Sequence, residues 1–254
     1  MCRHFAYLGP PASLRELIID PPHGLYRQSW APRHQRHGTV NADGFGVGWY
    51  ASGDPLPARY RRAQPIWADP SFGDVARVTK TTAALAAVRC ATTGTAAGEA
   101  AAAPYAAGPW LFSHNGAVSG WPEATVGLAA TLPAADLLAL EARADSALLW
   151  AVVLQRLRAG DGPAAALAAT VSLLRERSVH GRFNFLLTDG ETIAATAAGD
   201  TLCYRRRDGD VVVASEPCDD GAGWTAVPDG SVLAAAAGAV DVWPLVSGER
   251  IATR

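Results

Sequence analysis

The second residue of the chain is a cysteine, Cys2, directly after the initiator methionine. Removal of Met1 would leave a thiol and an α-amine on the same residue. An α-amine has an ordinary pKa of ~7.7–8.0, so it can accept the thiol proton, directly or through a water, without any histidine. This arrangement predicts a nucleophile that carries its own general base.

Taken alone, a cysteine at position 2 is an ordinary N-terminal residue, so the prediction depends on polar clusters downstream. The apolar segments 83–94 and 110–116 end in RCATTG and SHNG. We expect two buried strands whose polar ends meet at one edge of a sheet. A third cluster, ADS at 144–146, precedes apolar residues at helical spacing, which predicts a helix over 145–159 with Asp145 or Ser146 as its N-cap.

The remaining pattern predicts the elements that position these clusters. Ser13 and Glu16 have the spacing of a capping box before a helix over 14–19, and Pro163 begins a further helix that ends near residue 177. Segments 3–9 and 45–51 are expected strands, and Asp-Gly turns beyond Arg182 predict hairpins. This order of elements predicts one domain of α+β class over residues 2–254, with sheets stacked between helices.

Composition excludes several classes of protein. The 254 residues carry a net charge of -2, which gives no positive field for nucleic acid, and no apolar run is long enough to span a membrane. The four cysteines lack the spacing of a zinc site or a disulfide framework, so reduced thiols are expected. No secretory signal is recognised. We expect a cytoplasmic protein acting on a small molecule, without metal or cofactor; whether it forms a homo-oligomer is left open.

Read in order, MCRH, NADGFGVGWY, VRCATTG, SHNG, ADS and ASEP resemble the class II glutamine amidotransferases along nearly the whole chain. Any one of these clusters arises by chance, but five of them in sequence after a second-position cysteine are a specific pattern. The resemblance implies the N-terminal-nucleophile hydrolase fold, a four-layer α-β-β-α sandwich. This fold agrees with the strands and helices expected from the sequence pattern.

The resemblance also implies catalytic roles. Cys2 would attack the γ-carbonyl of a glutamyl substrate, with its α-amine as base, to form a thioester that water hydrolyses to glutamate. The side-chain amide of Asn115 and the backbone N–H of Gly116 would form the oxyanion hole, where loss of one donor typically costs ~10²–10³ in rate. A glycine at position 116 would let the backbone approach the substrate closely.

A glutamyl substrate presents an α-carboxylate and an α-ammonium, and the site should pair both charges. Arg89 suits the carboxylate as a two-pronged donor, and Asp145 suits the ammonium; Thr92 and His114 are expected to line the same pocket. The alternatives are a structural ion pair for Arg89 and a helix cap for Asp145. Where many family members read RWATHG, this chain reads RCATTG, and the difference bears on which amide is hydrolysed.

The chain has no room for a synthase domain, which favours a hydrolase that trims a glutamyl group away. MCRH with YLGPP, QSWAPR and FSHNGAVSGW resembles the ergothioneine-pathway branch of the family, whose substrate carries a trimethylammonium group. Aromatic faces bind such a cation, and Trp30 is a candidate, with a partly buried core residue as the alternative. Two other functions are a glutaminase that docks onto a synthase subunit and a non-enzymatic binding protein.

Overall fold

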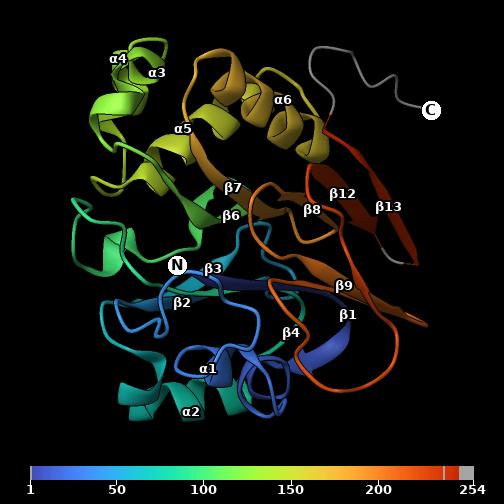
Figure 1. Ribbon diagram of the computed structural model, residues 1–254. Coiled ribbons are helices and arrows are strands. Elements are labelled where there is room, and N and C mark those ends of the chain that lie inside the picture. Colours follow the sequence, from blue (N-terminus) through green and yellow to red (C-terminus); the bar gives the residue numbers. More distant parts are fainter. Residues whose placement is uncertain (1, 237, 246–254) are drawn as a thin grey trace.

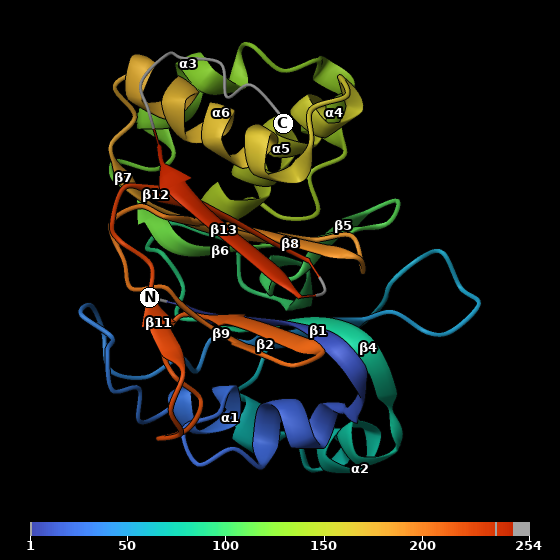
Figure 2. The same cartoon turned by 90° about the vertical axis from the view of Figure 1, so that its right-hand side faces the viewer.

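Two antiparallel sheets lie face to face between two layers of helices in the computed structural model, which describes residues 2–236 and 238–245 (Figures 1 and 2). The seven-stranded first sheet has the order β11-β9-β10-β1-β4-β2-β3, and the six-stranded second sheet has the order β13-β12-β8-β7-β6-β5. Helices α1 and α2 cover the outer face of the first sheet, and α5 and α6 cover that of the second (Figure 2).

The strands of the first sheet come from both ends of the chain. They are β1 (Arg3–Ser13), β2 (Phe45–Trp49), β3 (Ala58–Arg62), β4 (Lys80–Val88), β9 (Cys203–Arg207), β10 (Asp210–Ala214) and β11 (Trp224–Ala226). The strands of the second sheet are β5 (Tyr105–Ala107), β6 (Trp110–Val118), β7 (Gly181–Thr188), β8 (Thr192–Ala197), β12 (Ser231–Ala236) and β13 (Ala239–Pro244). Strand β1, which begins directly after Cys2, pairs with β4 on one side and β10 on the other.

The helices are mostly short, apart from two that cover the second sheet. The α-helices are α1 (Leu25–Gln28), α2 (Pro70–Val78), α3 (Val126–Ala129), α4 (Ala134–Leu138), α5 (Asp145–Arg158) and α6 (Pro163–Glu176). A π-helical turn, η1, spans Arg15–Ile19, and short 3-10 turns are η2 (Ile66–Ala68), η3 (Glu99–Ala101) and η4 (Glu123–Thr125). None of the helices within the described ranges is long and apolar enough to cross a membrane.

Alternation along the strands divides the core into three layers, because successive side chains of a strand point to opposite faces. Ala6 and Leu8 of β1 pack between the sheets, whereas Phe5 and Tyr7 face α1 and α2. Leu111 of β6 likewise lies between the sheets, and Phe112 lies under α5. The same alternation decides which polar residues at the strand ends point into the space between the sheets.

The fold class and the four layers expected from the sequence are confirmed. The Ser13–Glu16 capping box is also present: the backbone N–H of Ser13 donates to Glu16 (2.7 Å), and the N–H of Glu16 donates to the Ser13 hydroxyl (3.2 Å). The expected N-cap of α5 was wrong, because Ala144 occupies that position and Asp145 is the first helical residue. Its carboxylate still accepts a hydrogen bond from the N–H of Ser146 (2.8 Å).

Candidate active site

Cys2 lies at the head of β1, between the ends of two neighbouring strands. In the ladders of β1, Arg3 stands opposite Val88 of β4 and Phe5 opposite Ala214 of β10. If the pairing with β4 is extended by one residue, Cys2 lies opposite Arg89. If the pairing with β10 is extended in the same way, Cys2 lies beside the residues that follow Ala214. The half-buried Cys2 thiol lies 3.8 Å from the carbonyl oxygen of Cys90.

Arg89 is buried and hydrogen-bonded to the loop that follows β4. Its guanidinium donates to the backbone carbonyl oxygens of Asp43 (3.3 Å) and Ala96 (2.9 Å) and to the hydroxyl of Thr95 (3.0 Å). These contacts fix the guanidinium at the end of the strand, and no carboxylate within the described residues pairs with it. Burial raises the pKa of the Cys2 thiol, and the positive charge of Arg89 opposes that rise.

Asp145 is buried at the start of α5, and the loop that carries Arg89 reaches it through Thr92. The Thr92 hydroxyl donates to Asp145 at 3.4 Å, and the backbone N–H of Val118 donates to the same carboxylate oxygen at 3.0 Å. The Asp145 carboxylate therefore joins the start of α5 to β6 and offers a negative charge to the space beside Thr92. The ion pair considered for Arg89 is not formed with Asp145; each residue is fixed by other neighbours.

Tyr105 links these groups electrostatically. Its side chain is fully buried, and burial raises the pKa of its hydroxyl. The positive charge of Arg89 lowers that pKa, whereas the charges of Asp145 and Cys2 raise it further. The contacts that link the expected nucleophile to the two expected head-group residues run through the loop after β4, where the Cys90 carbonyl oxygen meets the Cys2 thiol and Thr92 donates to Asp145.

Asn115 reaches the start of β1 through Ser215, which follows β10. The Asn115 side-chain amide donates to the Ser215 hydroxyl (3.2 Å), and that hydroxyl also accepts the backbone N–H of His4 (3.0 Å). Asn115 is fully buried, and its side-chain oxygen has no hydrogen-bond partner within the described structure. Ser215 thus holds the Asn115 amide group against β1, directly after Cys2, a role that sequence reasoning did not assign to it.

The ladder geometry orients the backbone N–H of Gly116. Phe183, its partner on β7, directs its own N–H to Ala198, away from β6. Because the Phe183 N–H points away from β6, Gly116 and Phe183 form one of the pairs of an antiparallel ladder that exchange no hydrogen bonds. The N–H of Gly116 therefore also points away from β7. Val118, two residues further along, has the same orientation and donates to Asp145. The Gly116 N–H is therefore on the Asp145 side of β6.

A different contact explains why position 116 is a glycine. A Cβ atom there would collide with the carbonyl oxygen of Arg182 on β7 and would lie 2.6 Å from Nε2 of His114. The sequence interpretation assigned this glycine to close approach by the substrate. The observed requirement is instead the close approach of β7 to β6, which fixes the position of the Asn115–Gly116 pair.

His114 faces the helices and not the nucleophile. Its ring contacts the hydroxyl of Ser146 through Nδ1 (3.0 Å) and the carbonyl oxygen of Arg182 through Nε2 (2.8 Å). Burial lowers the pKa of His114, so the ring is neutral at neutral pH. Because Asn115 points between the sheets, its neighbour His114 must point the other way. His114 thus supports β6 and α5 beside Ser146, the neighbour of Asp145, and its place in the head-group pocket stays a prediction.

Trp30 follows α1 and belongs to an aromatic group on the outer side of the first sheet. Its ring makes edge contacts with Tyr26 (5.0 Å between centroids) and Trp67 (5.6 Å). The guanidinium of Arg27 lies 5.2 Å from the Trp30 centroid. The half-buried ring therefore already has a cationic neighbour from the preceding helix α1, and no described contact joins it to Cys2, Arg89 or Asp145.

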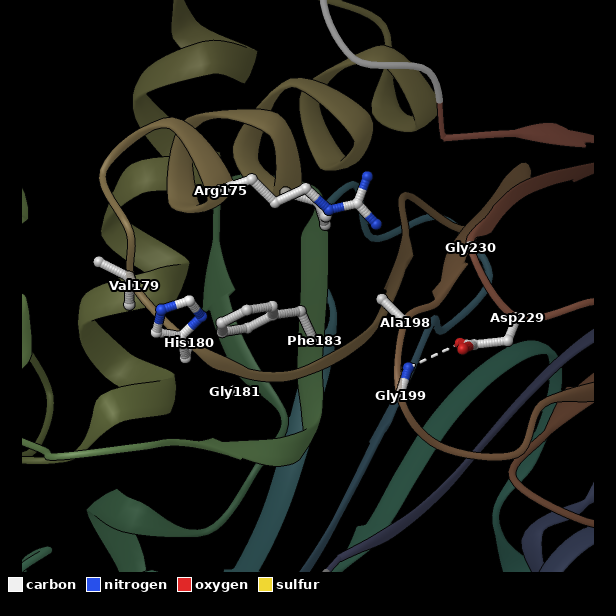
Figure 3. Close-up of a pocket in the computed structure, with 10 residues that line it drawn as sticks. Arg175, Val179, His180, Gly181, Phe183, Ala198, Gly199, Asp229 and Gly230 are labelled. Atoms are coloured by element: carbon white, nitrogen blue, oxygen red, sulfur yellow. Dashed lines mark hydrogen bonds between the residues drawn. The ribbon is translucent and has the colours of Figure 1, made fainter.

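A cavity of about 350 Å³ opens between α6 and β7 but is separate from these residues (Figure 3). Its polar lining comes from Arg175, His180 and Asp229, and Asp229 accepts a hydrogen bond from the backbone N–H of Gly199 (2.7 Å). None of the eight residues expected at the active site lines it. Within residues 2–236 and 238–245, no group of three or more His, Cys, Asp or Glu side chains is arranged to hold a metal ion.

Two stacked antiparallel sheets between helices, with a cysteine at the head of a central strand, define the class of N-terminal-nucleophile hydrolases. The family model described as glutamine amidotransferases class-II matches residues 25–209, and the chain belongs to this family. A solved glutamine aminotransferase class-II domain protein from Silicibacter pomeroyi is 25% identical, with a TM-score of 0.70, and the match covers 96% of this chain and 100% of that one.

Curated relatives are more similar in sequence. The γ-glutamyl-hercynylcysteine sulfoxide hydrolase of Mycolicibacterium smegmatis is 42% identical, over 90% of this chain and 93% of that protein. The hydrolase of the same name from Mycobacterium tuberculosis is 41% identical, over 90% of both chains. A probable glutamine amidotransferase of Saccharomyces cerevisiae is 26% identical, over 92% of this chain and 81% of that protein.

Proposed function

We propose that the chain is an amidohydrolase that removes the γ-glutamyl group from γ-glutamyl-hercynylcysteine S-oxide, giving glutamate and hercynylcysteine S-oxide in ergothioneine biosynthesis. The observation that carries this proposal is the 42% identity to a hydrolase of that name across nine-tenths of both chains. The loop that follows β4 supports it independently. This loop begins at Arg89, contacts the Cys2 thiol through the Cys90 carbonyl oxygen and reaches Asp145 through Thr92, and a glutamyl head group needs a cation, an anion and a nucleophile close together.

In the proposed reaction Met1 is removed and the α-amine of Cys2 accepts the thiol proton. The thiolate attacks the γ-carbonyl, and Asn115 and the Gly116 N–H bind the resulting oxyanion. The α-amine then gives its proton to the departing amine, which leaves a γ-glutamyl thioester on the sulfur. A water, deprotonated by the same α-amine, hydrolyses the thioester and restores the thiol. Arg89 binds the substrate α-carboxylate, and Asp145 with Thr92 binds the α-ammonium.

The proposed context follows the same chemistry. All four cysteines are free thiols in the structure, which supports a reducing compartment such as the cytoplasm. The chain would act as one domain over residues 2–254 on a small-molecule substrate. Trp30 is kept as a candidate for binding the trimethylammonium group, although such binding would require displacement of Arg27 from its ring.

Mass spectrometry of the intact protein, mixed rapidly with the conjugate, tests this proposal. We expect the wild-type chain to lack Met1 and to accumulate one glutamyl group, and Cys2→Ala to acquire none. Cys90→Ala is the matched control, because it removes the neighbouring half-buried thiol but leaves the carbonyl that contacts Cys2. It should still form the thioester.

Other outcomes would replace the proposal. Faster turnover of glutamine than of the conjugate, increased by an added synthase, would identify a glutaminase component. Undiminished binding by Cys2→Ala, together with no turnover by the wild type, would identify a binding protein. Retention of Met1 in an active enzyme would refute the role of the α-amine.

A further inference from the structure

Arg89 and Asp145, the two residues proposed to bind the glutamyl head group, come from different layers of the fold. Arg89 follows β4 of the first sheet, whereas Asp145 begins α5, which covers the second sheet. A glutamyl head group carries its α-carboxylate and α-ammonium on one carbon atom, so both charges are paired only at one separation of the two residues. That separation has to be set by contacts that join the two layers.

The segment that leads into Asp145 is only partly anchored by packing. No residue from 133 to 143 is buried, and residues 140–144 form neither helix nor strand. A cavity of about 220 Å³, lined by Leu140 and Trp150 among others, lies between this segment, β5 and α5. Because apolar side chains of the segment are at most half-buried, polar contacts are needed to hold it in place.

Glu141 joins this segment to the first sheet. Its two carboxylate oxygens accept from the guanidinium of Arg59 (2.9 and 3.1 Å), and one of them also pairs with the guanidinium of Arg61 (2.8 Å). All three side chains are half-buried. Half-buried charges are screened less by water and salt than exposed ones, so this three-membered network holds its geometry better than a single surface pair.

Strand β3, at the edge of the first sheet, presents both arginines to Glu141. Arg59 and Arg61 are two residues apart and therefore share one face of the strand. Their partners on β2 are Gly48 and Gly46, and a Cβ at Gly46 would lie 2.9 Å from Cγ of Arg61. The glycine on β2 thus leaves room for the arginine to lie over it and reach the carboxylate.

A backbone hydrogen bond connects the same segment to Arg89. The N–H of Ala96, in the loop after β4, donates to the carbonyl oxygen of Arg143 (2.8 Å). The carbonyl oxygen of Ala96 in turn accepts from the Arg89 guanidinium (2.9 Å). Between α4 and α5 the chain is therefore held to the first sheet at Glu141 and to the Arg89 loop at Arg143, directly before Asp145.

We infer that Glu141 is a positioning residue for the glutamyl pocket. Its ion pairs with β3 hold Asp145 at a fixed separation from Arg89, so Glu141 acts through Asp145 and not by contact with the substrate. This inference rests on the proposed function, because it takes the two pocket residues to bind the α-ammonium and the α-carboxylate. It gives the arginine-rich strand β3 a role in specificity: a ligand with both charges needs the set separation, whereas a ligand with one does not.

Steady-state kinetics of Glu141→Gln with γ-glutamyl-hercynylcysteine S-oxide test the inference. The variant keeps the shape of the side chain but loses the charge that binds both arginines. We expect KM to rise about tenfold and kcat to stay within about twofold, because the pocket binds the head group equally in the ground state and in the transition state. Asp136→Asn is the matched control. Asp136 is 21% exposed, against 24% for Glu141, and its ion pair with Arg158 (2.8 Å) joins α4 to α5 only, so KM should not change.

Competitive inhibition of the same reaction separates positioning from a general loss of structure. L-Glutamate carries both head-group charges, whereas glutarate lacks the α-ammonium and γ-aminobutyrate lacks the α-carboxylate. A ligand with one charge can follow its own partner when the separation changes, but glutamate cannot. In Glu141→Gln the Ki of glutamate should therefore rise about tenfold, while the Ki values of the other two change by less than about twofold.

The outcomes distinguish failure of this inference from failure of the proposed function. If the wild type hydrolyses the conjugate and Glu141→Gln keeps its KM, only the inference is overturned. An equal rise in Ki for all three inhibitors would also overturn it, because that result indicates loss of structure and not a changed separation. If the wild type turns over glutamine but not the conjugate, the proposed function fails, and the same comparison with glutamine as substrate decides the inference. If it hydrolyses neither, both fail.

Discussion

Gly116→Ala should disturb stability and catalysis together, because β7 leaves no space for a side chain at position 116 of β6. The added Cβ would collide with the carbonyl oxygen of Arg182 and stand 2.6 Å from Nε2 of His114, far inside the 3.0 Å that real Cβ atoms keep from their neighbours. The backbone oxygen cannot rotate away, so the strands must separate locally and the bond between His114 and Arg182 must lengthen.

The expected magnitude follows from these two changes. Overpacking of a tight site costs ~1–3 kcal/mol, and a weakened hydrogen bond adds about 1 kcal/mol, so the free energy of unfolding should fall by about 2–4 kcal/mol. For a chain of this length that corresponds to a decrease in melting temperature of roughly 4–16 °C. Displacement of the Gly116 N–H from the oxyanion should also lower kcat by ~10²–10³.

Thermal unfolding and steady-state hydrolysis of the conjugate, both measured on the folded variant, check this prediction. Gly73→Ala is the matched control, since a Cβ at position 73 meets no atom within 4 Å and lies in helix α2. It should be neutral or stabilise by up to about 1 kcal/mol. A Gly116→Ala protein with wild-type stability and kcat would refute the strand-contact argument; lost stability with full kcat would refute only the oxyanion role.

Three other changes give separate predictions. Asn115→Ala should lower kcat by ~10²–10³ with KM nearly unchanged, and an unchanged kcat would remove Asn115 from the oxyanion hole. Asp145→Asn keeps an oxygen for Val118 but loses its charge, so KM should rise by ~10–100-fold in the same assay; a wild-type KM would contradict ammonium binding. Burial lowers the pKa of His4 to about 3, whereas an unfolded histidine titrates near ~6.5, so between these values only the unfolded chain binds the proton. The free energy of unfolding should therefore decrease as pH falls below ~6.5, by up to several kcal/mol near pH 3. Urea titrations at about pH 7 and about pH 5 measure this decrease, and it should be smaller in His4→Gln than in the wild type. An equal decrease in both proteins would show that His4 does not contribute.

Local signals in the sequence identified much of the fold. The spacing of Ser13 and Glu16 predicted the turn after β1, and the apolar segments with polar ends predicted β4 and β6, because these signals depend only on neighbours along the chain. The N-cap of α5 was misassigned, since Asp145 satisfies its helix from the first helical position instead of the position before it. The strands β12 and β13 were not predicted, although Asp229 and Gly230 form an Asp-Gly pair directly before β12.

The orientation of His114 was available from the sequence but was not used. Asn115 and His114 are neighbours on a predicted strand, and a period of two places neighbours on opposite faces. Once Asn115 was assigned to the site, His114 had to face the helices, where it contacts Ser146. The role of Ser215 was not accessible in this way, because its contacts to His4 and Asn115 join segments 211 and 100 residues apart.

Polar residues between the two sheets explain why the site forms at this end of the sandwich. Along most of β1 and β6 the facing side chains are apolar, as at Ala6 and Leu111. At the head of β1, His4 instead meets Ser113, and Ser215 joins the His4 backbone to Asn115. A buried polar group must be hydrogen-bonded to offset its desolvation, so these residues fix one another in position. Cys2 and Asn115, the proposed nucleophile and oxyanion donor, are then held at a set separation by the core before any substrate binds.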